Sequence, residues 1–71
     1  MRARESSLET ARRRVREAEE RLRLQEAVVA RMKADGRPTE VAGMLAQAYR
    51  EFLKHARREL EMAEAQESRR R

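Results

Sequence analysis

The sequence predicts an all-α protein, folded as an antiparallel, coiled-coil-like helical hairpin, and three observations support this prediction. Apolar residues recur at helical spacing in both halves of the 71-residue chain. Charged residues make up 44% of the sequence, aromatic residues only 3%, and cysteine is absent, a composition typical of long helices without disulfides. One turn signal at residues 35–38 separates the two halves, so a single hairpin spanning residues 1–71 is expected.

The first predicted helix covers about residues 7–34. Its start carries a capping-box pattern, in which Ser6 is followed three residues later by Glu9. Gln25 is the one polar residue in an otherwise apolar heptad seam, and a lone polar residue there can fix the register through a hydrogen bond. The seam consists of two rows, offset by three residues: Leu8, Val15, Leu22 and Val29, and then Ala11, Ala18, Gln25 and Met32.

The predicted turn covers residues 35–39. Gly36 suits the left-handed conformation that commonly ends a helix. Pro38 cannot continue the first helix and disfavours helical backbone at Arg37. Thr39 is a candidate N-cap for the second helix, and Glu40 then lies at the positive end of the helix dipole.

The second predicted helix covers about residues 40–66, and a basic C-terminal tail of residues 67–71 follows it. The only two aromatic residues, Tyr49 and Phe52, lie in its apolar pattern and are expected to anchor the core. The pattern keeps a spacing of three and four residues through Ala42, Leu45, Tyr49, Phe52, Ala56 and Ala63, with Val41, Ala48, Leu53 and Leu60 beside it.

The apolar stripe of the second helix is wider than one neighbouring helix can cover. At about 100° per residue it spans roughly 200°, from Met44 and Met62 to Leu53 and Ala46. The sequence therefore predicts a homodimer that forms a four-helix bundle; a different protein partner is the alternative. The expected core and dimer-interface residues are Leu8, Val15, Leu22, Val29, Met32, Leu45, Tyr49, Phe52, Leu53 and Leu60.

The net charge of +5 gathers at the open end of the hairpin, where both chain ends lie. One interpretation is an anion-binding or nucleic-acid-binding end, built from Arg12, Arg13, Arg14, Arg16, Arg57 and Arg58. The favoured interpretation is a solvated helix surface, because no aromatic residue stands among these arginines to stack on bases. Helical i,i+4 pairs are expected between Arg13 and Glu17, Arg16 and Glu20, Glu17 and Arg21, Glu19 and Arg23, and Arg57 and Glu61.

No catalytic, metal-binding or cofactor-binding pattern is present, so neither an enzyme nor a cofactor is predicted. His55, the only histidine, is expected at the surface or its boundary. Glu59 occupies a seam position and is expected to shift to the edge or to pair with Arg14 or Arg16. No apolar window approaches the length of a membrane span, and the N-terminal residues lack the apolar stretch of a signal peptide, so a cytoplasmic protein is expected.

One stretch of the chain, about residues 12–60, resembles small alphaproteobacterial helical-hairpin proteins of no assigned function. The resemblance rests on residues 25–32, Asp35, Gly36, Thr39, Ala42, Leu45, Tyr49, Phe52 and His55. The chain departs from that pattern at Arg37, where a histidine is usual, and at Met44, where a leucine is usual. The resemblance implies a cytoplasmic bacterial hairpin and no particular activity. Together the patterns predict a small self-associating structural or protein-interaction module.

Overall fold

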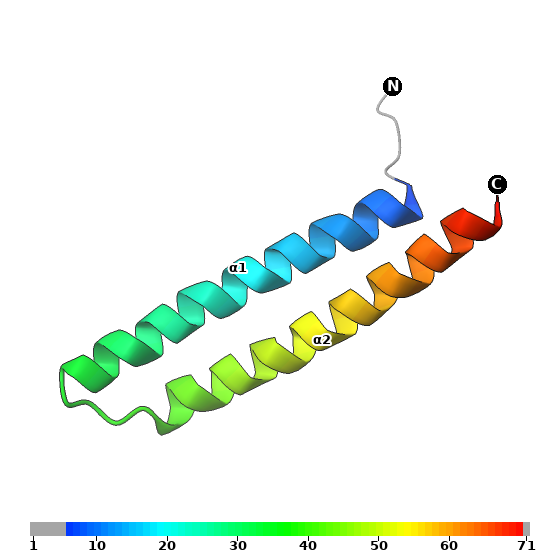
Figure 1. Ribbon diagram of the computed structural model, residues 1–71. Helices are drawn as coiled ribbons and strands as arrows, with labels where there is room; N and C mark the ends of the chain where they lie inside the picture. Colours follow the sequence, from blue (N-terminus) through cyan, green and yellow to red (C-terminus); the bar gives the residue numbers. More distant parts are fainter. Residues whose placement is uncertain (1–5, 71) are drawn as a thin grey trace.

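A computed structural model describes residues 6–70 of the chain, and this part consists of two helices. Helix α1 spans Ser7–Ala34 and helix α2 spans Glu40–Arg69. The two helices lie side by side in opposite directions, joined by the turn of residues 35–39, so that α1 begins where α2 ends (Figure 1). The predicted all-α helical hairpin is confirmed. The molecule measures 54 × 28 × 14 Å, the dimensions of a single layer of two helices.

Both ends of α1 are closed by side-chain and backbone hydrogen bonds. The Glu9 backbone N–H donates to Ser6 Oγ at 3.1 Å, and the Ser6 backbone N–H donates to Glu9 Oε1 at 3.0 Å, which confirms the capping box. Gly36 has a φ of +70°. The Arg37 N–H donates to the Met32 carbonyl at 2.9 Å and the Gly36 N–H donates to the Lys33 carbonyl at 3.1 Å. This pair of bonds defines a Schellman motif, which requires the left-handed glycine.

The start of α2 differs from the expectation. Thr39 occupies the N-cap position, but its side chain makes no capping hydrogen bond. Its backbone has φ −114° and ψ 5°, whereas a side chain that caps usually sits on extended backbone. The predicted capping role of the Thr39 side chain is therefore wrong; the Thr39 carbonyl instead accepts from the Gly43 N–H at 2.7 Å.

Helix α2 continues to Arg69, three residues beyond the expected end at about residue 66. Residues 67–69, assigned to the basic tail from the sequence, are helical. They contain neither glycine nor proline, and no feature of their sequence stops a helix that is already formed. Arg70 lies just past the end of the helix, and residue 71 lies outside the described range.

The interface between the helices is built mainly from alanine. Ala18, Leu53 and Ala56 form its central cluster, and Val15 and Leu22 pack against them. Five apolar residues of the described helices are buried, and Leu53 is the only large one among them; the others are Ala11, Ala18, Ala46 and Ala56. None of the described large side chains is completely enclosed. Small residues let the two helices approach closely, but one hairpin does not enclose a core of its own.

The seam residue Gln25 fixes how the two helices align. Its Nε2 donates to the Ala42 carbonyl at 3.0 Å in a partly buried position, so the hydrogen bond expected from the sequence is present.

Across the described range, neither helix has an apolar stretch of the length needed to cross a membrane.

The ten expected interface residues are not equally covered in one hairpin. Leu53 is buried, whereas Leu45 is 42% exposed and Phe52 is 64% exposed. The other seven are half-buried along the seam: Leu8, Val15, Leu22, Val29, Met32, Tyr49 and Leu60. Contrary to the expectation, Phe52 does not anchor the core of the hairpin, because it lies beside the seam on α2 and does not face α1.

Candidate functional site

The two broad faces of the hairpin differ in chemistry. One face carries ion pairs that bridge the helices: Arg50 Nη2 lies 3.2 Å from Glu26 Oε2, and Arg57 Nη2 lies 3.6 Å from Glu19 Oε2. We refer to it as the ion-pair face. All four side chains are about half exposed, so each pair contributes no more than about 1 kcal/mol to stability. This face is suited to contact with water.

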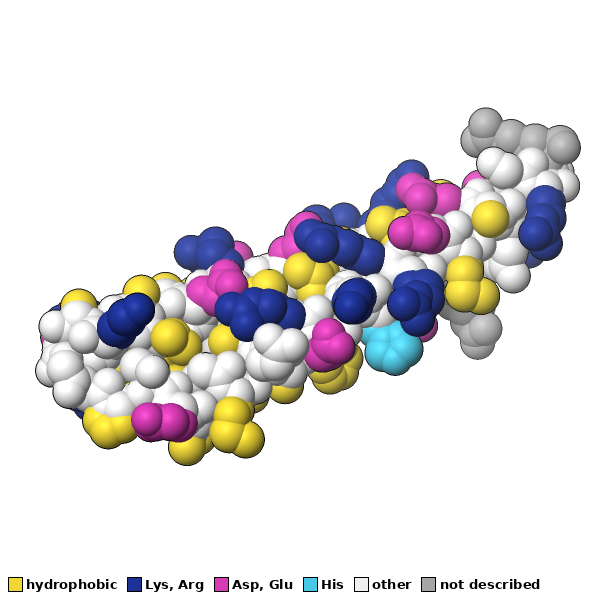
Figure 2. All heavy atoms as spheres, turned by 60° about the horizontal axis from the view of Figure 1, so that its bottom comes forward, with side chains coloured by type: hydrophobic (Ala, Val, Ile, Leu, Met, Phe, Trp, Pro, Cys, Tyr) yellow, Lys and Arg dark blue, Asp and Glu magenta, His cyan; other side chains and the backbone are white. Residues whose placement is uncertain are grey.

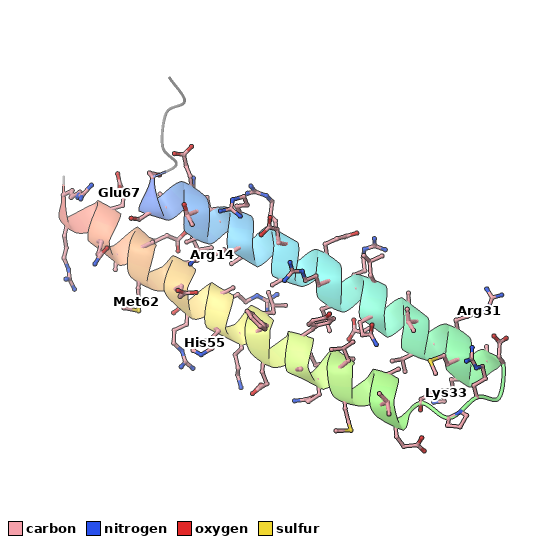
Figure 3. The ribbon with its side chains drawn as sticks, turned by 180° about the vertical axis from the view of Figure 1, so that it is seen from behind. Arg14, Arg31, Lys33, His55, Met62 and Glu67 are labelled. Carbon is pink, nitrogen blue, oxygen red and sulfur yellow. The ribbon has the colours of Figure 1, made fainter. Side chains whose placement is uncertain are left out.

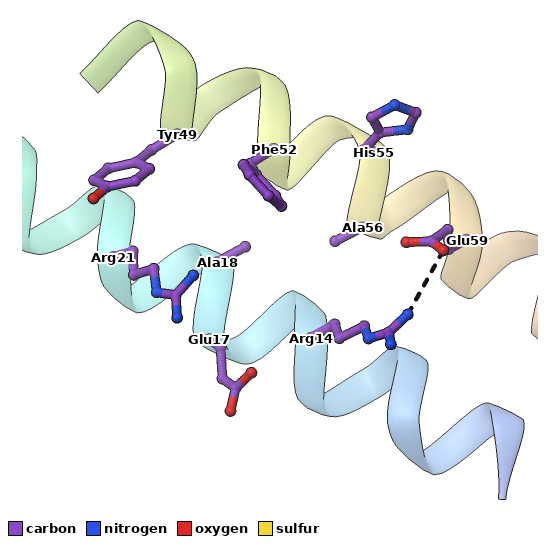
Figure 4. Close-up of a pocket in the computed structure, with 9 residues that line it drawn as sticks. All are labelled: Arg14, Glu17, Ala18, Arg21, Tyr49, Phe52, His55, Ala56 and Glu59. Carbon is purple, nitrogen blue, oxygen red and sulfur yellow. Dashed lines mark ion pairs between the residues drawn. The ribbon is translucent and has the colours of Figure 1, made fainter. Parts of the chain in front are cut away.

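The opposite face contains a groove between the helices with a volume of about 400 Å³. Ala18 of α1 and Ala56 of α2 are the smallest residues in its lining, while the rings of Tyr49 and Phe52 project from α2 beside them (Figure 4). Charged and polar side chains complete the lining: Arg14, Glu17, Arg21, His55 and Glu59. The groove exists because two alanines meet where larger residues would fill the space.

Exposed apolar side chains extend this surface beyond the groove. On α1, Leu24 and Val28 follow the groove residues Glu17 and Arg21 by seven positions, which is two helical turns, and therefore lie on the same side of the helix. They are 52% and 46% exposed. We call the whole surface, including the groove, the groove face.

Helix α2 contributes the larger part of the groove face. Val41 and Leu45 precede Phe52 by eleven and seven residues, and Met44 and Met62 lie eleven before and seven after His55. His55 and Met62 point away from α1 on the outer side of α2 (Figure 3). Val41 and Met44 are 81% and 72% exposed. Several large apolar side chains exposed on one side of a hairpin typically mark an interaction surface.

One ion pair crosses the groove face. Arg14 Nη1 lies 3.8 Å from Glu59 Oε2, and both side chains are 56% exposed. Glu59 therefore sits at the edge and pairs with Arg14, as expected from the sequence. The pair closes the groove toward the open end of the hairpin (Figure 4).

The six arginines of the candidate anion-binding end do not form one surface. Arg14 lines the groove, whereas Arg57 and Arg58 line a concavity on the ion-pair face. Arg13 pairs with Glu17 at 3.2 Å, Arg14 with Glu59, and Arg57 with Glu19. Arg12, Arg16 and Arg58 are exposed. Basic and acidic side chains alternate over the visible surface (Figure 2), a distribution typical of a solvated helix surface.

The surface ion pairs only partly follow the expected spacing. Arg13 and Glu17 form the expected i,i+4 pair. Arg23 instead reaches Glu20 at i,i−3, with its Nε donating to Glu20 Oε2 at 3.0 Å, and this hydrogen bond lowers the pKa of Glu20 and raises that of Arg23. Arg57 pairs across the hairpin and not with Glu61. The second helix lies close enough to offer ion-pair partners, as Arg57 does for Glu19. A rule based on spacing within one helix does not take such partners into account.

Within residues 6–70, no three side chains of the metal-ligating types gather at one point. His55 is exposed at the rim of the groove, where the sequence placed it. The groove combines an apolar interior with a mixed charged rim, which is suited to packing against another surface.

The sequence identified Tyr49 and Phe52 but did not single out Ala18 and Ala56 as site residues. The feature that could have indicated them is their small size at seam positions of both helices, where larger residues are common.

No protein-family model, curated protein sequence or solved structure matches the chain.

Proposed function

We propose that the protein is a self-associating helical module, in which two hairpins pack groove face against groove face as a four-helix bundle. The observation that supports this proposal is a groove face that exposes large apolar side chains on a molecule only one layer thick. Stable domains are normally built from at least two packed layers around a shared core. A second copy supplies the missing layer.

The amount of exposed surface fits such a partner. The accessible surface of the chain is 6265 Å², whereas a compact monomer of 8.4 kDa is expected to expose about 4,600 Å². The excess is roughly 1,700 Å². Two copies that each cover this excess bury ~3,300 Å² in total, which lies in the range of obligate homodimers.

The shape of the chain supports the same proposal. Its radius of gyration is 16.3 Å, while a compact domain of 71 residues is expected near ~11 Å. Stacking a second layer on the groove face makes the assembly thicker without making it longer. The ion-pair face of each copy then faces outward on both sides of the bundle, where its charges remain hydrated.

A substitution at the centre of the groove face tests the proposal. Phe52→Ser removes the most exposed aromatic ring from the proposed interface in both copies at once. A buried Phe typically contributes several kcal/mol, so we expect the dimer dissociation constant to rise by at least about 100-fold. Size-exclusion chromatography with light scattering over a dilution series measures this change.

Lys54→Ser is the matched control, because Lys54 is exposed two residues away and lines the concavity on the ion-pair face. It should leave the dimer intact. A monomeric wild-type chain, or equal effects of the two variants, would contradict the proposal. A wild-type chain that remains monomeric but binds a different protein through Phe52 would assign the groove face to a heterologous partner.

A further inference from the structure

We infer that the two copies pack with their turns at the same end, so that α1 of each copy lies over α2 of the other. This inference rests on the proposed dimer and adds its geometry. The two-fold axis then runs along the helices. Packing the groove faces with turns at opposite ends instead places α1 over α1 and α2 over α2.

The groove face is not uniform along its length. Its half near the turn is mainly apolar, and we call it the turn half: Leu24, Val28, Val41, Met44 and Leu45. Its charged member is Arg31, seven residues after Leu24, which is exposed and pairs with Asp35 of the turn. Its other half, which we call the open half, is charged and polar except for Met62: Arg14, Glu17, Arg21, His55, Glu59 and Met62. Phe52 lies between the two halves. Hydrophobic side chains are visible near the turn in Figure 2, while basic and acidic side chains are mixed in the middle of the molecule.

Packing with turns at the same end matches the apolar residues. The bond between Gln25 and the Ala42 carbonyl shows that residues near position 25 of α1 lie level with residues near position 42 of α2. The two-fold axis keeps these levels equal in both copies. Leu24 and Val28 of one copy therefore lie over the segment 41–45 of the other, so that each turn half covers its counterpart.

The same arrangement matches the charges of the open half. The side chains of Arg14 and Glu59 meet across the two helices, as their ion pair shows. The two-fold axis therefore also brings Arg14 of one copy over Glu59 of the second copy. Two arginines and two glutamates then meet at this level, and each charge has neighbours of opposite sign on both hairpins.

The opposite arrangement places unlike surfaces together. With turns at opposite ends, the turn half of each copy lies over the open half of the other. Leu45 and Val41 are then placed near Glu59, and Leu24 near Arg14. Burying a charged group against apolar side chains is unfavourable because the group loses hydration without gaining a partner. The distribution of residues therefore favours turns at the same end.

Distance measurement between spin labels tests this geometry. The chain contains no cysteine, so Arg37→Cys introduces a single labelling position in the exposed turn. With turns at the same end, the labels of the two copies lie within the width of the bundle, on the order of 20–30 Å. With turns at opposite ends, their separation approaches the 54 Å length of the hairpin.

The experiment tests dimerisation and the orientation of the two copies separately. Dilution with an excess of unlabelled protein should abolish the dipolar signal, because the coupling is between copies, and light scattering on the labelled sample reports whether a dimer is present. A dimer with a short distance supports the inference. A dimer with a separation near 50 Å, or with both distances, overturns it and leaves the proposed dimer in place. A monomer overturns both.

Discussion

Gln25 illustrates how a single polar residue sets the geometry of this hairpin. Alanines make up four of the five buried residues in the described part of the seam, and small side chains alone allow the helices to slide past one another. The hydrogen bond from Gln25 Nε2 to the Ala42 carbonyl favours one alignment, because any other leaves a partly buried amide without this acceptor. That alignment determines which residues of the groove face are level with each other.

Gln25→Glu tests this role with almost no change in shape. The substitution replaces the donating amide with a carboxylate that faces the Ala42 carbonyl, so an attraction becomes a repulsion. We expect the free energy of unfolding to fall by about 1–3 kcal/mol, measured by urea denaturation followed by circular dichroism. Gln47→Glu is the control, because Gln47 is exposed and its side chain accepts from Arg50 Nη1. Equal stabilities of the two variants would contradict a structural role for Gln25.

Residue-scale features could be read from the sequence where local chemistry decides them. Ser6, Gly36 and Gln25 belong to motifs that are defined by short spacing and by backbone requirements. Thr39 was misassigned because its capping ability depends on a backbone conformation that the preceding turn determines. The exposure of Phe52 could not be read either, because it depends on how α2 is rotated about its axis relative to α1.

At the scale of the elements, the two glycines have opposite expected effects. Gly36→Ala forces an alanine into a left-handed conformation, with φ at +70°, and should destabilise the protein by about 1–2 kcal/mol. Gly43 lies inside α2, and a Cβ added there meets no atom within 4 Å. Gly43→Ala should therefore stabilise the protein by about 0.5–1 kcal/mol. Thermal unfolding of both variants checks the signs, and a shared sign would contradict the assigned turn conformation or helix position.

The two helix starts also differ in what their capping residues contribute. Ser6→Ala removes the side-chain acceptor of a complete capping box and should lower the free energy of unfolding by ~1 kcal/mol. Thr39→Ala removes no capping bond and should change it by only a few tenths of a kcal/mol. Ser7→Ala, one position inside α1, controls for helix propensity. The order of these effects would be reversed if Thr39 were the stronger cap.

The existence and limits of the helices were largely predictable. Heptad spacing, a capping box and a glycine–proline turn are strong local signals, and they agree with one another. The end of α2 was placed three residues too early, because charge alone suggested a tail where nothing stops the helix. The surface ion pairs were predicted less well, since Arg57 and Arg50 reach across to the other helix, a contact that requires knowledge of the packing.

For the whole molecule, the unequal faces connect the fold to the proposed function. The sequence predicted an apolar stripe too wide for one neighbour, and seven large apolar residues within positions 6–70 are in fact exposed. It did not predict that charged residues occupy the open half of that face and apolar residues the turn half. This division depends on the register between α1 and α2. The same division of the groove face favours the orientation with both turns at one end.

Sedimentation equilibrium over a hundredfold dilution, with helicity followed by circular dichroism on the same samples, tests the central claim most directly. A hairpin that completes its core only with a second copy should sediment at twice the chain mass of 8.4 kDa. It should lose helicity as it dissociates, because folding and assembly are then linked. A fully helical species at 8.4 kDa throughout the dilution would contradict the claim and show that the hairpin is stable with its groove face exposed.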